Sequence, residues 1–317
     1  MTRTRALKYG ILSSMYSRYE HDGLVWIDLE SPTREEVGKI ITEFEIVPLI
    51  AEELLFPATK PRAEFYERYT YLVMHFPALR HSHKTREQEI DFIVGKNFLI
   101  TTHYDIIDPL HKFAKIFEVH SILDHGQSQE HAGFLFFYML KKLYKAVEHE
   151  VEYVRHEMTL IEENIFSDRQ VEMVVAISRS ARDLLNLRQM IEPHRDVLQT
   201  LESQGPKLFG AEFAPYLRGI SNEYYRVHNH VMREMESLHE LRETNNSLLT
   251  TKQNETMKVF TILAFVTFPL ALISSIFSMD TPDTPIINQP GGFWMVMGIM
   301  VVTATLMFWY FRHKKWF

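Results

Sequence analysis

The amino-acid sequence predicts an α+β membrane protein, and three observations carry that prediction. Two runs of 19 residues near the C-terminus, 259–277 and 293–311, contain no charged side chain. Strand-like and helix-like segments alternate before residue 130, as in an α/β domain. From about residue 130 to residue 258, the apolar residues have helical spacing. The expected parts are a cytoplasmic α/β domain (1–130), an antiparallel helical pair (131–213), a stalk helix continuing into the first span (214–277), an outer loop (278–292), a second span (293–311) and a basic tail (312–317).

Composition and charge exclude several classes of protein. The chain of 317 residues has no cysteine, so we expect neither disulfide bonds nor a thiolate metal site. A formal net charge of −7 gives no bulk attraction to nucleic acid, and we expect no such partner. The first residues lack the apolar core of a signal peptide. Neither a glycine-rich phosphate loop nor a nucleophile–base pair is recognisable, so we predict no enzyme and no bound cofactor.

The α/β region contains strand signals and one clear helix start. The strand-like segments are residues 23–30, 69–79 and 89–104. The last of them predicts a hairpin that turns at Gly95–Asn97. Residues 31–44 predict a helix with Ser31 as its N-cap, Pro32 at the first helical position and acidic residues in the first turn.

The middle of the chain predicts two long amphipathic helices. They cover residues 133–166 and 170–203, and the turn between them lies near Ser167–Asp168. A break is expected at 203–210, which contains Gly205, Pro206 and Gly210. A third helix is expected to start near Pro215.

This third helix is expected to be very long, because no helix breaker occurs between Pro215 and Pro269. If it continues to Ile276, it is roughly 90 Å long at about 1.5 Å per residue. Such a helix needs neighbours along its length to be stable. Its first part has apolar residues at the alternating three- and four-residue spacing of a helix seam: Leu217, Ile220, Tyr224, Val227 and Val231.

Each charge-free run is long enough to cross a membrane. As a helix it covers roughly 28 Å, close to a hydrocarbon core of about 30 Å. Aromatic residues border the second run, as in the belts found at membrane interfaces. They are Trp294, Trp309, Tyr310 and Trp316.

The charges around the two runs predict their orientation. Basic residues flank the ends away from the intervening loop: Lys252, Lys258, Arg312, Lys314 and Lys315. The loop contains Asp280 and Asp283 but no cation. Because basic flanks stay cytoplasmic, we expect a two-pass protein of the cell (inner) membrane, surrounded by the lipid bilayer, with both termini in the cytoplasm.

A second stripe follows the long helix into the first span. Steps of three and four residues from Glu243 pass Ser247 and Thr250 and then reach Asn254, Met257, Thr261, Ala264, Phe268, Ala271 and Ser275. Around a central axis, these residues would make a hydrated funnel, then hydrophobic constrictions of the kind that gate by dewetting, then a small-residue channel. Ordinary packing between membrane helices explains the small residues equally well. Two spans cannot enclose a pore in one subunit, so a channel would need several copies.

Residues Asn254 to Asp280, NETMKVFTILAFVTFPLALISSIFSMD, resemble the CorA family of divalent-cation channels. That family typically has Asn-Glu-x-Met-Lys-Val-x-Thr here, then a proline in mid-membrane and a Gly-Met-Asn signature. The C-terminal FRHKKWF and the earlier KPRAEFYERYTYLVMHFP and GKNFLITTH are also similar to the family. The resemblance therefore covers nearly the whole chain.

The resemblance implies a funnel-shaped homopentamer that conducts Mg²⁺ and often Co²⁺ or Ni²⁺, with a ZntB-like branch that handles Zn²⁺. Carried over position by position, it makes the seven residues from Asn254 to Ser275 in the stripe the lining of the pore. It places the hydrophobic gate at Met257 and Phe260, together with Phe268.

The family's Gly-Met-Asn signature is replaced here by Ser278-Met279-Asp280. In the family, the asparagine forms a ring of amide oxygens that meets a hydrated cation at the outer mouth. Asp280 would give a carboxylate ring, which attracts cations more strongly while its members repel each other. Asp283 is the expected counterpart of an acidic residue that follows the signature. We predict that Asp280 contacts the transported ion, and the choice of ion stays open.

The family also senses cytoplasmic Mg²⁺ with acidic residues between subunits, one of them early in the stalk helix. Gly219 stands where that acid is expected, and Glu223 is nearby but displaced. Glu243, lower in the stalk, keeps an acidic position facing the axis. The resemblance therefore leaves open whether cytoplasmic Mg²⁺ closes this protein.

The leading prediction is a pentameric channel for Mg²⁺, Co²⁺ or Ni²⁺. The alternatives are a ZntB-like Zn²⁺ transporter, proton-coupled through Asp280, and a membrane scaffold or sensor that does not conduct. His228 and His230 have a two-residue spacing that chelates poorly on a helix, and His81 and His83 could face one way only in an extended segment. We expect all four to be solvated rather than zinc ligands. We expect the same of the acidic face formed by Glu148, Glu150, Glu152, Glu157, Glu162 and Glu163.

Overall fold

The computed structural model describes residues 15–21, 23–77, 87–104, 107, 109–110, 131–279, 286 and 290–314. The chain divides into two compact units. The first contains residues 1–167 and 173–241, and the second contains residues 168–172 and 242–317.

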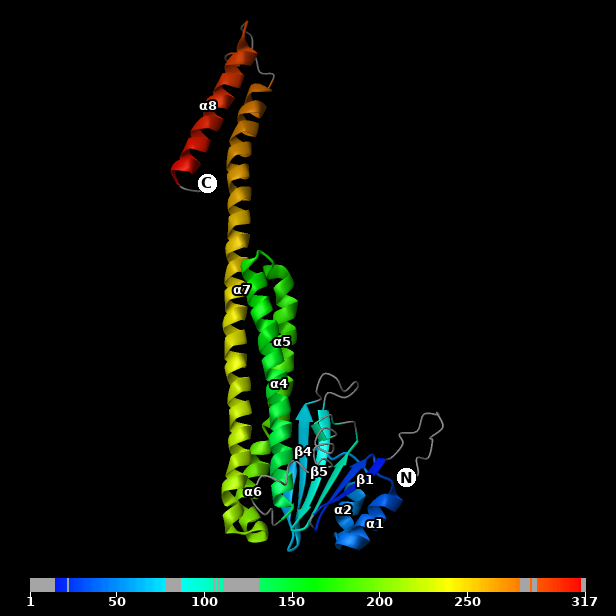
Figure 1. The fold of residues 1–317 in the computed structure, drawn as a ribbon. Coiled ribbons are helices and arrows are strands. Elements are labelled where there is room, and N and C mark those ends of the chain that lie inside the picture. Colours follow the sequence, from blue (N-terminus) through cyan, green and yellow to red (C-terminus); the bar gives the residue numbers. More distant parts are fainter. Residues whose placement is uncertain are drawn as a thin grey trace. The chain divides into compact units, whose positions relative to one another are not determined.

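The first unit is built on a six-stranded sheet in the order β1-β2-β6-β5-β4-β3 (Figure 1). Its strands are β1 (Met15–His21), β2 (Leu24–Glu30), β3 (Arg62–Phe65), β4 (Tyr69–Pro77), β5 (Glu87–Gly95) and β6 (Phe98–His103). The pair β2–β6 is parallel and the other pairs are antiparallel. The three predicted strand regions and the hairpin are confirmed, whereas β1 and β3 were not predicted.

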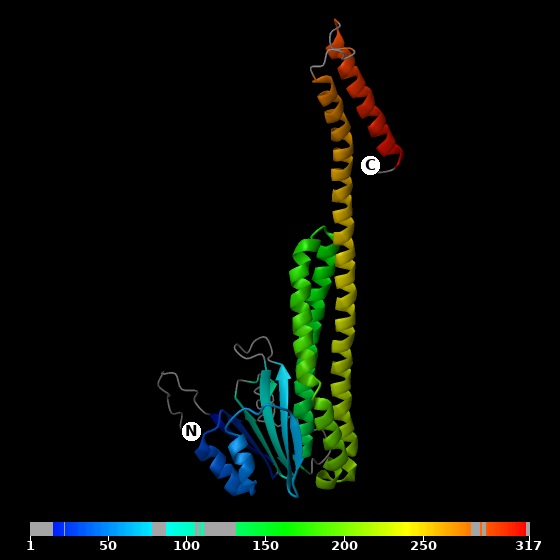
Figure 2. The ribbon, with the colours of Figure 1, turned by 180° about the vertical axis from the view of Figure 1, so that it is seen from behind.

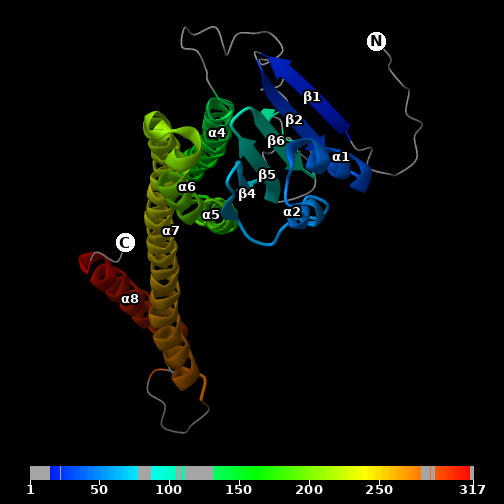
Figure 3. The ribbon, with the colours of Figure 1, turned by 90° about the horizontal axis from the view of Figure 1, so that it is seen from below.

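Two short helices, α1 (Arg34–Phe44) and α2 (Pro48–Glu53), cover one face of this sheet (Figure 3). Their apolar residues form a buried core with the strands, in which Ile40 and Ile50 meet residues such as Ile27, Tyr71 and Ile100. This apolar layer fixes the register, because a slip by one residue would turn every side chain to the other face.

The predicted start of α1 is wrong by two residues. Its N-cap is Thr33, whose hydroxyl accepts from the Glu36 amide while the Glu36 carboxylate accepts from the Thr33 amide. This reciprocal capping box stabilises the start of the helix. Ser31 instead belongs to the end of the sheet, because its amide donates to the carbonyl of His103 over 2.8 Å.

The other face of the sheet carries the helices α4 (Gly133–Phe166) and α6 (His194–Phe209). The antiparallel partner of α4 is α5 (Gln170–Ile191), and their turn lies where the sequence predicts it. The single helix predicted over 170–203 is wrong, because Pro193 separates α5 from α6. The break predicted over 203–210 is confined to Gly210, since α6 continues through Pro206 and ends at Phe209.

The helix α7 (Ala214–Phe277) is continuous over 64 residues and includes Pro269. The short 3-10 helix η1 (Ala211–Phe213) precedes it. All five predicted seam residues from Leu217 to Val231 are buried, and the ring of Tyr224 lies 6.2 Å from that of Tyr144 in α4. The predicted long helix and its seam are therefore confirmed.

The second unit contains the later part of α7, the helix α8 (Gly292–His313) and the residues 168–172 (Figure 2). The side chain of Asn245 is 1% exposed and donates to the Gln170 carbonyl over 3.1 Å. Lys252 forms an ion pair of 2.7 Å with Asp168. These bonds fasten the α4–α5 turn to α7 just before the apolar run.

Candidate ion pathway

The two apolar helices of the second unit have almost no protein cover. None of the most apolar window of the helix that ends at Phe277 is buried, and 6% of that in α8 is buried. Both helices are long and apolar enough to cross a membrane. A core helix of a soluble protein would be mostly buried, and these two helices are not.

One side of α7 in this unit faces α8. Ile262 is 9% exposed, and the Phe265 ring lies 6.3 Å from that of Phe311 in α8. Less exposed positions recur along both helices at spacings of three and four residues. They are Ile262, Val266, Pro269, Ile273 and Phe277 in α7, and Gly292, Val296, Met300, Thr303, Met307 and Phe311 in α8.

The predicted lining stripe lies on the other side of α7. At about 100° per residue, its seven members centre about 150° from the side that faces α8. Five of them are exposed, whereas Thr261 and Ala264 are half-buried. The Thr261 hydroxyl donates to the Met257 carbonyl over 2.8 Å, which leaves its oxygen able to accept from water. The single chain therefore leaves a polar, small-residue stripe uncovered.

The three predicted gate residues share this uncovered side. Met257, Phe260 and Phe268 are all exposed, and Phe268 is 73% exposed, among the highest values for a large apolar residue of α7. Bulky apolar side chains that one chain leaves in the open are candidates for a constriction formed between several copies.

The predicted outer mouth is only partly within the described residues. Ser278 and Met279 close the end of α7, where the Ser278 amide donates to the Ser274 carbonyl over 3.0 Å. Asp280 and Asp283 lie outside the described residues. The proposed carboxylate ring therefore stays a prediction.

The early stalk has no acid available in the expected place. A Cβ on Gly219 would lie 3.2 Å from Cε2 of Phe137 in α4, so this position packs against a ring. Glu223 is 2.6 Å from Arg226 and 3.9 Å from Lys141, and two cations therefore already neutralise its carboxylate. Glu243 is exposed lower in the helix.

The prediction that the acidic face of α4 is solvated is only partly correct. Glu148 forms an ion pair of 3.0 Å with Arg226 of α7, and Glu152 lies 3.7 Å from His230. His228 packs its ring 5.7 Å from Tyr224. Among the described residues, no group of three or more His, Asp or Glu side chains could hold a metal ion. His81 and His83 lie outside them.

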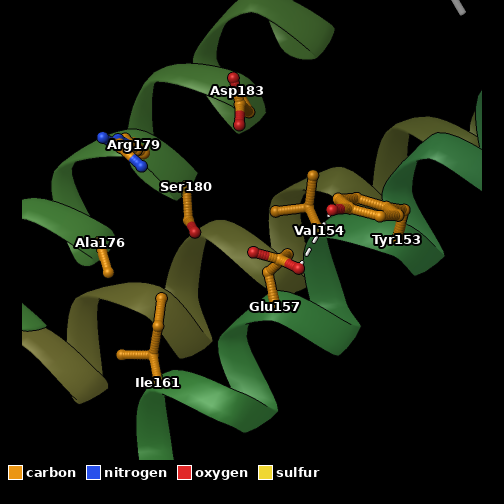
Figure 4. A pocket seen from close by; sticks show the side chains of 8 residues that line it. All are labelled: Tyr153, Val154, Glu157, Ile161, Ala176, Arg179, Ser180 and Asp183. Carbon is orange, nitrogen blue, oxygen red and sulfur yellow. Dashed lines mark hydrogen bonds between the residues drawn. The ribbon is translucent and has the colours of Figure 1, made fainter. Parts of the chain in front are cut away.

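Sequence reasoning missed a hollow of about 230 Å³ between α4 and α5 (Figure 4). Glu157 of α4 and Ser180 of α5 point toward one another across it, and Tyr153 donates to Glu157 over 3.1 Å. Asp183 and Arg179 also line it, so the acidic charge is partly balanced. The residues that line it recur every three or four positions on α4 and on α5. This recurrence on both helices is the sequence signal that could have indicated the hollow.

The chain is similar to known proteins over most of its length. A family described as "CorA-like Mg2+ transporter protein" matches residues 21–313. The cobalt/magnesium transport protein CorA of Thermotoga maritima is 27% identical over 296 residues, 92% of this chain and 83% of that protein.

Solved structures show the same fold. The complete structure of the CorA magnesium transporter from Methanocaldococcus jannaschii has a TM-score of 0.79 at 21% identity, with 94% of this chain and 93% of that chain covered. The ZntB cytoplasmic domain from Vibrio parahaemolyticus has a TM-score of 0.60 at 9% identity, with 72% and 88% covered. Because the family match spans nearly the whole chain, this protein belongs to the CorA-like Mg²⁺ transporter family.

Proposed function

We propose that this protein is a homopentameric channel that passes divalent metal cations across the cell (inner) membrane. The single observation that carries the proposal is the uncovered stripe of polar and small residues on the side of α7 that faces away from α8. Lipid alone does not favour the polar side chains of Thr261 and Ser275 on that side, and Asn254 continues the stripe beyond the span. Several copies around an axis would enclose these residues in a water-filled path.

The proposed path begins outside at Asp280, together with Ser278, Met279 and Asp283. It continues past Ser275 and Ala271 to a constriction at Phe268. Ala264 and Thr261 then lead to the gate at Met257 and Phe260, and Asn254 opens into the cytoplasmic funnel above Glu243. A membrane potential of about 100 mV favours entry by about 2.3 kcal/mol per charge, and hence by about twice that for a divalent ion.

The ions are proposed from the names of the relatives. The Thermotoga maritima protein is a cobalt/magnesium transport protein, and the Methanocaldococcus jannaschii structure is of a magnesium transporter. We therefore propose Mg²⁺ or Co²⁺ as the cargo, with Ni²⁺ as a further candidate. Asp280 is proposed to meet the ion through its water shell, because Mg²⁺ loses water reluctantly.

Flux into liposomes tests this function. Purified protein is reconstituted, its copy number is measured by mass, and uptake of Mg²⁺, Co²⁺, Ni²⁺ and Zn²⁺ is compared for the native chain, Asp280→Asn and Asp283→Asn. We expect Asp280→Asn to change the ratio of the uptake rates of two of these ions at least threefold. We expect Asp283→Asn to change that ratio less. Pentamers that pass none of these ions would contradict the proposal and favour a scaffold or sensor.

A second candidate function is Zn²⁺ transport coupled to protons through Asp280. The observation that favours it is the likeness of the cytoplasmic fold to the ZntB domain. In the same liposomes, an imposed pH gradient would then drive Zn²⁺ uptake without a membrane potential. Zn²⁺ uptake that is indifferent to the gradient would remove this candidate.

A further inference from the structure

An acidic residue is buried in the layer between the sheet and α2. Asp91 of β5 is fully buried, and its strand partners on the same face are Val73 in β4 and Thr102 in β6. Its neighbours along the face include Ile93 of the α1–α2 core. A carboxylate taken out of water in this way is costly unless it is paired or protonated.

The pairing of Asp91 is incomplete. Among the described residues, neither of its carboxylate oxygens has a hydrogen-bond partner at ordinary geometry, and the hydroxyls of Tyr71 and Thr102 have none either. Glu89 lies two residues earlier on the same face of β5, so their Cα atoms are about 7 Å apart. Two carboxyl groups therefore share one dry compartment.

The guanidinium nearest this compartment is paired with other acids, and the nearby histidine contacts Glu89 rather than Asp91. Arg62 of β3 forms ion pairs with Glu53 of α2 and with Glu64. His75 of β4 contacts the Glu89 carboxylate, with Nε2 and Oε2 3.0 Å apart. Burial first, and then the negative charge of Glu89, raise the pKa of Asp91 well above its ordinary value, while Arg62 and Tyr71 oppose this rise more weakly.

Tyr104 completes the set of titratable groups around Asp91. Burial, followed by the charges of Asp91 and Glu89, raises the pKa of its phenol, so it stays neutral. Its hydroxyl donates to the Glu53 carbonyl at the end of α2 over 3.4 Å. The compartment therefore contains two acids, two phenols and a histidine, with one guanidinium at its edge.

The same groups hold the end of α2 and the loop after it. The Glu89 Oε1 atom accepts from the amide of Ala58 over 2.9 Å, and Arg62 and Tyr104 both bind Glu53. The segment between Glu53 and Ala58 carries Leu55 and Phe56, which line a groove of about 540 Å³ between α1 and α2. A change of charge in the compartment therefore acts on the segment that carries two of the residues lining this groove.

We propose that the buried Asp91 carries a proton in the folded chain, and that loss of this proton releases the end of α2 and the segment Glu53–Ala58 from the sheet. With the proton, Asp91 is a neutral acid beside Glu89, and Glu89 keeps its bonds to Ala58 and His75. Without it, two negative charges share one dry compartment, and water must enter to separate them. The fold then contains a pH-sensitive device that acts on the α1–α2 groove.

The direction of the pH effect follows from linkage. Above about pH 3.9 the unfolded chain loses the Asp91 proton while the folded chain retains it, so this group makes the fold less stable as pH rises toward its folded pKa. An ionised Asp91 held by Arg62 would have the opposite effect, because its pKa would be depressed. The sign of the pH dependence therefore separates the two arrangements.

The test compares the full chain in detergent with Asp91→Asn between pH 5 and pH 9. Asparagine keeps the volume of the neutral acid, so we expect the variant to melt no earlier than the native chain and to lose less stability with rising pH. Amide exchange over Glu53–Ala58, corrected for its intrinsic pH dependence, is expected to accelerate at least tenfold in the native chain and less than threefold in the variant. The infrared band of a protonated carboxylic acid is expected only in the native chain.

Two further variants keep the test decisive. Glu89→Gln retains an acceptor for Ala58 but removes the charge, so the native transition is expected to move to lower pH. Asp28→Asn changes an acid on β2 that accepts from Thr101 on the opposite face, and we expect it to leave the exchange of Glu53–Ala58 unaltered. An Asp91→Asn variant that melts earlier than the native chain, with no infrared band lost, would overturn the proposal.

Discussion

His194 is a fully buried histidine that joins α6 to the sheet and to α4. Its Nε2 atom donates to the His75 carbonyl over 2.8 Å, so its Nδ1 atom accepts from the Tyr144 hydroxyl over 3.0 Å. Burial lowers the pKa of this imidazole to about 3. The ring is therefore neutral at any physiological pH and serves the packing of the domain.

This residue predicts acid sensitivity. The stabilising contribution of a histidine with a depressed pKa is complete above about pH 6.5 and is lost as pH falls toward its folded pKa, by up to about 1.4 kcal/mol per pH unit. We expect the melting temperature to fall between pH 6.5 and pH 4. His194→Gln retains one donor and one acceptor without titrating, so it should melt earlier at pH 7 but show a flatter acid slope. Parallel slopes in thermal melts of the two proteins would contradict this assignment.

Gly219 allows a second prediction at the scale of one residue. Alanine there gains up to about 1 kcal/mol of helix propensity, and contact with the Phe137 ring at 3.2 Å offsets part of that gain. We expect Gly219→Ala to change stability by less than about 1 kcal/mol and flux very little. Gly219→Asp supplies the stalk acid that the family resemblance implies, so liposome flux should become at least threefold more sensitive to Mg²⁺ on the cytoplasmic side. Equal sensitivity in all three proteins would show that this position does not govern closure.

At the scale of elements, the α4–α5 turn is fastened to α7 by Asn245 and Lys252. Asn245→Ala removes a buried donor to the Gln170 carbonyl and should cost about 1 kcal/mol. We expect amide exchange over residues 168–172 to rise at least threefold in this variant. Its neighbour Asn246 is exposed, so Asn246→Ala is the control and should leave that exchange unchanged. A rise of the same size in both variants would mean that helix propensity, rather than this bond, is measured.

The elements also show what the sequence could predict. Apolar spacing was sufficient for α4, α7 and the hairpin, because each is a local periodic pattern. The start of α1 was misplaced although Thr33 and Glu36 have the spacing of a capping box, because Ser31-Pro32 offered a competing signal. Pro206 predicts a break, but the buried residues Leu201 and Leu208 on either side keep α6 continuous.

The candidate site also has features that local sequence patterns predict and features that depend on contacts between distant residues. The lining stripe follows from local helical spacing, so the sequence predicted which residues share a side of α7. The side that faces α8 could not be predicted, since it depends on contacts such as Phe265 with Phe311. The Asp91–Glu89 compartment was missed because its character depends on Arg62, Tyr71 and Tyr104, which the sheet register brings together from three other parts of the chain.

At the scale of the whole molecule, the open question is what covers the stripe on α7. Lipid and neighbouring copies of the chain are the two possible covers for a surface in the membrane. The chain has no cysteine, so a single introduced thiol reports on its own position without background. Ala271 lies on the stripe, and Ile273 lies on the side that faces α8, about 200° away around the helix.

We expect Ala271→Cys to form disulfide-linked pairs between copies and to react with a charged, water-soluble thiol reagent. Both results follow if the stripe surrounds a hydrated axis, because a disulfide needs Cα atoms within about 7 Å of each other. Ile273→Cys should do neither, since it lies on the side of α7 that faces α8, away from the stripe. Chemical cross-linking of the native chain through its lysines should give a ladder that ends at five copies. Efficient pairing through Ile273→Cys, or an unreactive Ala271→Cys in protein that still conducts, would mean that the ions take another path.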